Sequence, residues 1–239
     1  MKKQNKKTAV ILQARMGSSR LPGKVLKDLC GKTILERCLD RLKMIHKSVL
    51  VVVATTNQLE DKEIVKVARA NHVPYFQGSE ENVLERYYQA AKEYGVQYII
   101  RATADNPAID PYEAKKTLDY ILSHDVDYVS AIDNVQGFSL PIGVGVEAFT
   151  LEALEESWKN AIKKEHKEHI NEYLLEHVNN FKIHRMKCGS ALNCPDLSLT
   201  IDYHKDFEFF ENMMSYFQKP WECVSSEEII QWYYQNKEK

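Results

Sequence analysis

Short apolar runs alternate with amphipathic stretches along the first 130 residues of the chain. The apolar runs predict buried strands at residues 9–12, 48–54, 74–77, 98–101 and 128–132. Between them, apolar residues recur every three or four positions, which predicts helices at residues 34–42, 61–70, 82–94 and 112–122. Strands that alternate with helices at this spacing indicate an α/β fold around a mostly parallel sheet.

The second half of the chain departs from this alternation. Residues 137–149 are rich in glycine and strand-forming residues, 151–163 predict an amphipathic helix, and 163–176 are very polar. Alternating apolar and polar residues predict a strand with one solvated face at 181–187, and a last strand follows at 197–202 before two closing helices. We expect a single domain over residues 1–239, in which residues 137–194 form a flap, a dimer surface or both.

The loop after the first predicted strand concentrates cations among small residues. Gly, Ser and Pro there allow a close backbone approach, hydroxyls add donors, and fixed cations neutralise charge, so the loop suits a polyphosphate. The residues concerned are Arg15, Gly17, Ser18, Ser19, Arg20, Gly23 and Lys24. The alternative is a solvated basic turn, which fits poorly directly behind a buried strand.

Two common phosphate-binding motifs do not fit this loop. Five residues separate Gly17 from Gly23-Lys24, one more than a P-loop has, and Val25 stands where that motif needs Ser or Thr. A dinucleotide-binding glycine fingerprint is also missing after the strand.

The run Arg15-x-x-Ser18-x-Arg20-Leu-Pro-Gly-Lys24 resembles the nucleotide-binding loop of the cytidylyltransferases that make CMP-activated acidic sugars. Within that superfamily the chain is most similar to the spore-coat polysaccharide biosynthesis branch, over nearly its full length and most closely up to about Pro111. The resemblance implies a nucleotide-diphospho-sugar transferase (GT-A or Rossmann-like) fold, with three layers around a mixed, mostly parallel sheet. It also implies a nucleotide site formed by Gln13, Ala14, Arg15, Gly17, Ser18, Ser19, Lys24, Thr55, Arg86 and Thr103.

Two aspartates follow two predicted strands. Asp105 comes after the strand at 98–101, and Asp202 after the strand at 197–201. Carboxylates at strand ends of one sheet can meet above it and there bind Mg²⁺, which prefers oxygen ligands. The alternatives are a turn-forming Asp before Asn-Pro and a helix N-cap. Both positions match the metal ligands of the resembled family, although Tyr203-His204 stands where relatives usually carry Thr-Pro.

The pair Asp125 and Asp127 forms a D-x-D motif like that of metal-dependent glycosyltransferases. It comes before a predicted strand instead of after one, so we expect it at the opposite edge of the sheet, as a solvated turn.

The base and acceptor sites are less sharply marked. The resemblance assigns Thr55 and Arg86 to nucleotide recognition, and Glu147 and His169 to the acceptor side. Arg86 and His169 each lie among other charged residues, so a plain helix surface is the alternative.

Composition narrows the range of functions. A formal net charge of -2 argues against nucleic acid as a partner. Five cysteines without a C-x-x-C pair indicate reduced thiols and no structural zinc. The apolar run behind the basic Met1–Lys7 is too short for an export signal or a membrane span, so we expect a cytoplasmic protein with a frayed N-terminus.

These features together predict a CTP-dependent enzyme. An acceptor oxygen would attack the α-phosphorus of CTP and release pyrophosphate, with Arg15, Arg20, Lys24 and Asp105 as catalytic residues and Mg²⁺ on Asp105 and Asp202. The acceptor would be small and anionic (an acidic sugar, a polyol phosphate or a phosphonate) for surface-polysaccharide synthesis, and the enzyme a homodimer. Two alternatives stay open, namely a transferase for another nucleotide, such as a sugar 1-phosphate guanylyltransferase, and a non-catalytic partner in polysaccharide assembly.

Overall fold

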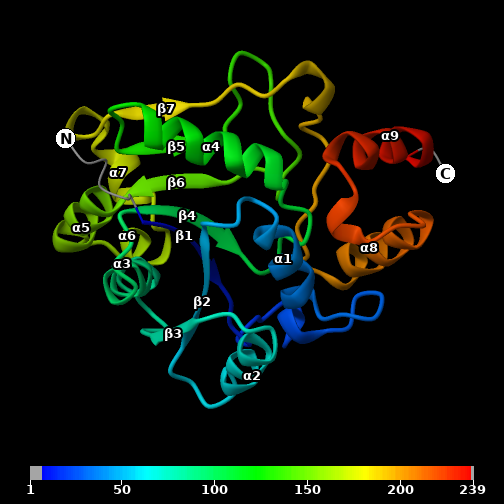
Figure 1. The fold of residues 1–239 in the computed structure, drawn as a ribbon, viewed down its shortest axis with the longest axis horizontal. Helices are drawn as coiled ribbons and strands as arrows, with labels where there is room; N and C mark the ends of the chain where they lie inside the picture. The colour runs from blue at the N-terminus through cyan, green and yellow to red at the C-terminus, as the bar shows by residue number, and fades with distance from the viewer. Residues whose placement is uncertain (1–6, 238–239) are drawn as a thin grey trace.

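A central β-sheet organises the fold (Figure 1). In the computed structural model, which describes residues 7–237, the sheet has seven strands in the order β3-β2-β1-β4-β6-β5-β7. Neighbouring strands pair in parallel, except that β6 runs antiparallel to β4 and β5. The strands are β1 (Thr8–Gln13), β2 (Leu50–Thr56), β3 (Tyr75–Gly78), β4 (Tyr98–Thr103), β5 (Tyr128–Ser130), β6 (Glu147–Thr150) and β7 (Ile183–Arg185). The mixed, mostly parallel sheet confirms the predicted fold class.

Helices cover both faces of the sheet, because the apolar strands have buried side chains on each side. In β1, Val10 and Leu12 pack into one core, whereas Ala9 and Ile11 pack into another. The first core includes α1 (Ile34–Lys43), α2 (Lys62–Ala70), α4 (Pro111–Ser123), α8 (His204–Tyr216) and α9 (Ser226–Asn236). The second includes α3 (Val83–Glu93), α5 (Leu151–Asn160) and α7 (Glu172–Glu176), and α6 (Lys164–Glu168) lies against α3. Short 3₁₀ helices span Lys24–Leu26, Val178–Asn180, Ser190–Leu192 and Trp221–Cys223.

Helix starts follow the cap residues in the sequence. Thr33 and Glu36 form a capping box at α1, and Ser225 with Glu228 forms another at α9. At α4, the Asp110 carboxylate accepts from two backbone N–H groups and Pro111 occupies the first turn. These local signals explain why the predicted helix boundaries lie close to the observed ones.

One predicted element is wrong. Residues 197–202 form no strand of the sheet, and their β-type contact is a single bridge between Ile142 and Ser198. The apolar positions Leu197, Leu199 and Ile201 are buried as the pattern predicts. Their backbone bonds go to the loop around Ile142 and to Asp105, so the segment is extended and buried without joining the sheet.

The structure also bears on the predictions for residues 137–194, for membrane spans and for the N-terminus. Residues 137–194 contribute β6 and β7 to the sheet as well as α5, α6 and α7 outside it. In residues 7–237, every helix is too short or too polar to cross a bilayer. The frayed basic end predicted for Met1–Lys7 lies, apart from Lys7, outside the described residues.

A buried arginine joins the C-terminal helices to the rest of the fold. Arg41 of α1 is 1% exposed, and its guanidinium donates to the carbonyls of Ile109 (2.6 Å), Trp221 (2.9 Å) and Val224 (2.9 Å). Ile109 lies in the loop that follows β4 and contains Asp105, so this contact also holds one edge of the site described below.

We predict that Arg41→Met lowers the free energy of unfolding by about 3 kcal/mol or more, because three buried carbonyls lose a charged donor at once. Urea denaturation followed by circular dichroism measures the change. The matched control is Lys43→Met, two residues along the same helix, whose exposed side chain should change stability by less than about 0.5 kcal/mol. A loss below about 1 kcal/mol for Arg41→Met would show that the three carbonyls find other partners.

Candidate active site

The loop between β1 and the first 3₁₀ helix has a defined backbone. Gly23 has φ +66°, the left-handed region that glycine adopts without strain, and it directly precedes the 3₁₀ turn at Lys24–Leu26. The Asp61 carboxylate accepts from the backbone N–H of Met16 at 2.7 Å, and the Ser18 hydroxyl accepts from that of Leu21 at 3.2 Å. These contacts fix the turn that presents Lys24.

The same loop lines a cavity of about 270 Å³. Its walls come from the carboxyl ends of β1 and β4 and from the segment before α8, and the residues are Gln13, Ala14, Arg15, Gly17, Ser18, Ser19, Arg20, Lys24, Val25, Thr103, Ala104, Asp105 and Asp202. The backbone N–H groups of Gly17 and Ser19 find no acceptor among residues 7–237. They can therefore donate to an anion in this cavity.

Lys24 connects the two predicted metal ligands. Its Nζ lies 2.9 Å from Asp105 Oδ2, 3.1 Å from Asp202 Oδ1 and 2.7 Å from the Ile201 carbonyl oxygen. Its side chain is 10% exposed, whereas those of Asp105 and Asp202 are 28% and 32% exposed. The structure thus brings both aspartates to one place, with an ammonium group between them.

The rest of the Asp202 environment shows that it does not cap α8. The N-cap is Tyr203, and Asp206 accepts from the backbone N–H groups of Asp202 and Tyr203. Arg20 Nη1 lies 3.5 Å from Asp202 Oδ2, and its guanidinium lies 5.3 Å from the centre of the Tyr203 ring. The departure at Tyr203-His204 therefore leaves the helix start intact.

The donor set at this place fits a magnesium ion. The Asp105 and Asp202 carboxylates and the Ile201 carbonyl all present oxygen atoms to one point. Among residues 7–237, no group of three or more His, Cys, Asp or Glu side chains could hold a metal. Two carboxylates match the way Mg²⁺ binds when substrate phosphates and water complete its coordination.

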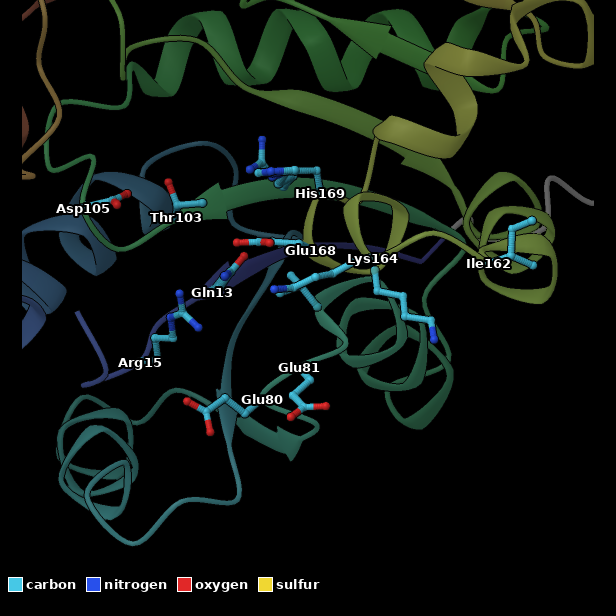
Figure 2. Close-up of a pocket in the computed structure, with 13 residues that line it drawn as sticks. Gln13, Arg15, Glu80, Glu81, Thr103, Asp105, Ile162, Lys164, Glu168 and His169 are labelled. Carbon is cyan, nitrogen blue, oxygen red and sulfur yellow. The ribbon is translucent and has the colours of Figure 1, made fainter. Parts of the chain in front are cut away.

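A larger cavity of about 920 Å³ adjoins the first and shares Gln13, Arg15, Thr103 and Asp105 with it. Its other walls come from the start of α3 and from the α6 segment (Figure 2). The added residues are Glu80, Glu81, Val83, Arg101, Ile162, Lys164, Lys167, Glu168 and His169. Figure 2 shows Glu168 pointing toward Gln13, with Lys164 extending away from Asp105.

Of the two predicted acceptor residues, His169 lines the larger cavity and Glu147 does not. Glu147 is 1% exposed and accepts from Arg101, from the Tyr128 hydroxyl and, at 2.7 Å, from Asn171. Burial alone lowers the pKa of Arg101, but Glu147 raises it above the usual value. Glu147 therefore holds a charged Arg101 at the cavity wall, where β4 and β6 pair these two residues.

Thr55 and Arg86, predicted to bind the nucleotide, line neither of the two cavities. Both are 0% exposed, and Thr55 Oγ1 has no hydrogen-bond partner in the described part of the chain. Arg86 donates to the Ser79 carbonyl, but its Nε and Nη2 are buried without a partner. Burial lowers the pKa of the Arg86 guanidinium, and the nearby charge of Arg15 acts in the same direction. A ligand that accepts hydrogen bonds would satisfy the Nε and Nη2 donors of Arg86.

The short helix α6 is held by a residue that faces away from the cavity. His166 is 1% exposed, its Nε2 lies 3.0 Å from Glu176 Oε2, and its ring packs edge-on against Tyr173. This contact fixes the backbone from which Lys167 and His169 extend. His166 is thus the buried anchor of an otherwise exposed helix.

The D-x-D pair lies at the amino end of β5. Asp127 accepts from the backbone N–H of Lys182, and Asp125 pairs with the ammonium group of the same lysine. Because β4 and β5 both run antiparallel to β6, this is the edge of the sheet opposite the cavities. The predicted position is confirmed.

Sequence reasoning missed most of the larger cavity. A charge inside the otherwise apolar strand at residues 98–101 is the signal that could have identified Arg101. Lys164 carries no such signal within a run of similar charges. Asp61, which positions the loop through Met16, also resembles an ordinary helix-start residue.

Comparison with known proteins decides the family. A sequence model described as cytidylyltransferase matches residues 9–238. This chain belongs to the cytidylyltransferase family. Its relatives include the spore coat polysaccharide biosynthesis protein SpsF of Bacillus subtilis, 30% identical over 231 residues that cover 92% of this chain and 91% of SpsF.

Solved structures agree with this assignment. A cytidylyltransferase from Leptospira borgpetersenii is 30% identical, with a TM-score of 0.87 over 97% of this chain and 95% of that one. A CMP:2-keto-3-deoxy-manno-octonic acid synthetase, solved with CTP, has the same fold at 17% identity and a TM-score of 0.69, over 88% of this chain and 99% of that one. The cytidylyltransferase described here is thus a nucleotidyltransferase, as the loop motif predicts.

We predict that Asp105→Asn lowers the stability of the metal-free protein, because Lys24 then loses one of two charged partners. The loss should be about 1 kcal/mol, less than a buried bond to a charged group contributes, since Asp105 is partly exposed. Urea denaturation in the presence of EDTA measures it. Asp125→Asn, at the opposite edge of the sheet, is the control and should be neutral. A gain in stability would mean that repulsion between Asp105 and Asp202 outweighs their attraction to Lys24.

Proposed function

We propose that this cytidylyltransferase transfers CMP from CTP to a small anionic acceptor and releases pyrophosphate. The observation that carries the proposal is the convergence of Lys24 and Arg20 with Asp105 and Asp202 at a cavity lined by a small-residue loop. A larger cavity beside it offers space for an acceptor next to the same Asp105. The acceptor class is an acidic sugar, a polyol phosphate or a phosphonate, for surface-polysaccharide synthesis.

The loop would hold the triphosphate. The N–H groups of Gly17 and Ser19 would donate to phosphate oxygens, and Arg15, Arg20 and Lys24 would neutralise the charge that builds on pyrophosphate as it leaves. Gln13, Ala14, Ser18 and Thr103 line the same cavity and would complete the nucleotide site.

Recognition of cytosine would fall to the region around Thr55 and Arg86. The Thr55 hydroxyl and the Nε and Nη2 of Arg86 are buried without partners, and a cytosine carbonyl that reached Arg86 would accept from it. Support for CTP as the nucleotide comes from the family and from the related synthetase solved with CTP.

A divalent metal would be held by Asp105 and Asp202. Mg²⁺ in this position supplies charge neutralisation at the α-phosphate. The acceptor itself would be oriented by Arg101, which Glu147 keeps charged and fixed, and by His169 and Lys167 on the α6 segment. Within residues 137–194, β6 and β7 belong to the sheet, so only the α6 segment would act as a flap. The homodimer remains a prediction.

We predict that CTP with Mg²⁺ raises the melting temperature more than ATP, GTP or UTP with Mg²⁺. A nucleotide at about 100 times its dissociation constant should add roughly 2.7 kcal/mol of stability. Differential scanning fluorimetry with the four nucleotides at equal concentration measures this. An equal or larger shift with GTP would contradict the assignment to CTP and favour a guanylyltransferase.

We predict that Arg20→Ala reduces turnover by about 10²–10³-fold, the usual effect of removing one group that stabilises transition-state charge. Pyrophosphate release in the presence of an accepted substrate gives the rate, and circular dichroism checks the fold. Arg185→Ala is the control, because Arg185 pairs with Asp133 away from both cavities. If Arg20→Ala keeps full turnover, the loop does not contact the reacting phosphates.

A further inference from the structure

Lys24 has a complete set of partners. A lysine ammonium group has three hydrogen-bond donors, and Lys24 Nζ has three oxygen atoms within 3.1 Å, from Asp105, Asp202 and Ile201. The group is also largely shielded from water, with its side chain 10% exposed. The contact is therefore a built cation site that the chain itself fills.

Two of these three oxygen atoms belong to the carboxylates that would hold a magnesium ion. Mg²⁺ binds carboxylate oxygens at about 2.0–2.1 Å and requires nearly octahedral geometry around itself. An ammonium group bonded to the same carboxylates would lie within a few ångströms of the ion and repel it. Lys24 in its observed position therefore competes with a metal on Asp105 and Asp202.

The cavity beside Lys24 offers its ammonium group another position. Lys24 lines the same 270 Å³ space as Gly17, Ser19 and Arg20, and its four-carbon stem allows Nζ to move within it. Phosphate oxygens bound by that loop would replace the carboxylates as acceptors. They would also supply the metal ligands that the two aspartates cannot provide alone, since no third metal-binding side chain joins them in residues 7–237.

We propose that Lys24 makes metal binding conditional on the nucleotide. Its ammonium group competes with the divalent cation for Asp105 and Asp202, and it gives up this place when a bound triphosphate offers it phosphate oxygens. The inference rests on the proposed function, because it takes the two aspartates as the metal ligands. It adds that the protein without nucleotide binds the metal weakly, and that Lys24 is the cause.

The test measures metal binding without nucleotide or turnover. Mn²⁺ is titrated into the protein, and the free ion is followed by electron paramagnetic resonance. Lys24→Met removes the charge but keeps an unbranched side chain of similar length, and it should bind Mn²⁺ about tenfold or more tightly than the wild type, within the range usual for coupled sites. The control is Lys27→Met, which removes an exposed lysine three residues away and should match the wild type.

A second substitution identifies where the metal binds. In the double variant Lys24→Met with Asp105→Asn, the gain in Mn²⁺ affinity should disappear. If Lys24→Met does not fold, Lys24→Gln serves in the same titration, because its amide can still donate to both aspartates without carrying charge.

The outcomes separate this inference from the function it rests on. In the first outcome, the wild type binds Mn²⁺ through Asp105, and Lys24→Met (or Lys24→Gln in its place) binds it no more tightly. Lys24 then does not compete with the metal, and only the inference fails. If none of the proteins binds Mn²⁺ through Asp105, with or without CTP, the proposed metal site fails as well. A tenfold gain that depends on Asp105 supports both.

Discussion

The contact between the Lys24 ammonium group and three oxygen atoms is the interaction on which the site depends. Those oxygen atoms come from the loop after β4 and from the segment before α8, while Lys24 comes from the first 3₁₀ helix. Segments separated by up to 178 positions in sequence are thus joined at one group. Holding two partly exposed carboxylates side by side is unfavourable unless a cation compensates their charge, and Lys24 supplies that compensation.

The arginines of this protein differ in how fully the chain satisfies them. Arg41 donates to three carbonyl groups and holds elements in place. Arg101 is neutralised by Glu147 at the wall of the larger cavity, but its Nε is buried without a partner. Arg86 keeps two buried nitrogen atoms without partners. A folded protein seldom leaves such donors unpaired, and those that remain mark where a ligand can contribute. Among the arginines, the number of unpaired buried nitrogen atoms therefore separates a structural role from a proposed binding role.

The sequence predicts the first half of the fold well, because β1 to β5 and α1 to α4 each follow from burial patterns and cap residues that act locally. The loop from Arg15 to Lys24 is predictable for the same reason, since its chemistry lies within ten consecutive residues. The pairing of Arg101 with Glu147 is not predictable in this way. It depends on β6 entering the sheet antiparallel to β4, which no local pattern in either strand reveals.

The segment 197–201 shows why a correct burial pattern can predict the wrong element and yet lead to the right site. Its apolar residues alternate because they are buried, but Ile201 donates its backbone N–H to the carbonyl of Asp105 at 2.9 Å instead of extending the sheet. This main-chain bond draws Asp202 beside Asp105 without involving any side chain. The two carboxylates would therefore stay adjacent whichever cation lay between them. In the proposed exchange, one pair of aspartates would serve first a lysine and then a metal ion without movement of the backbone that holds them.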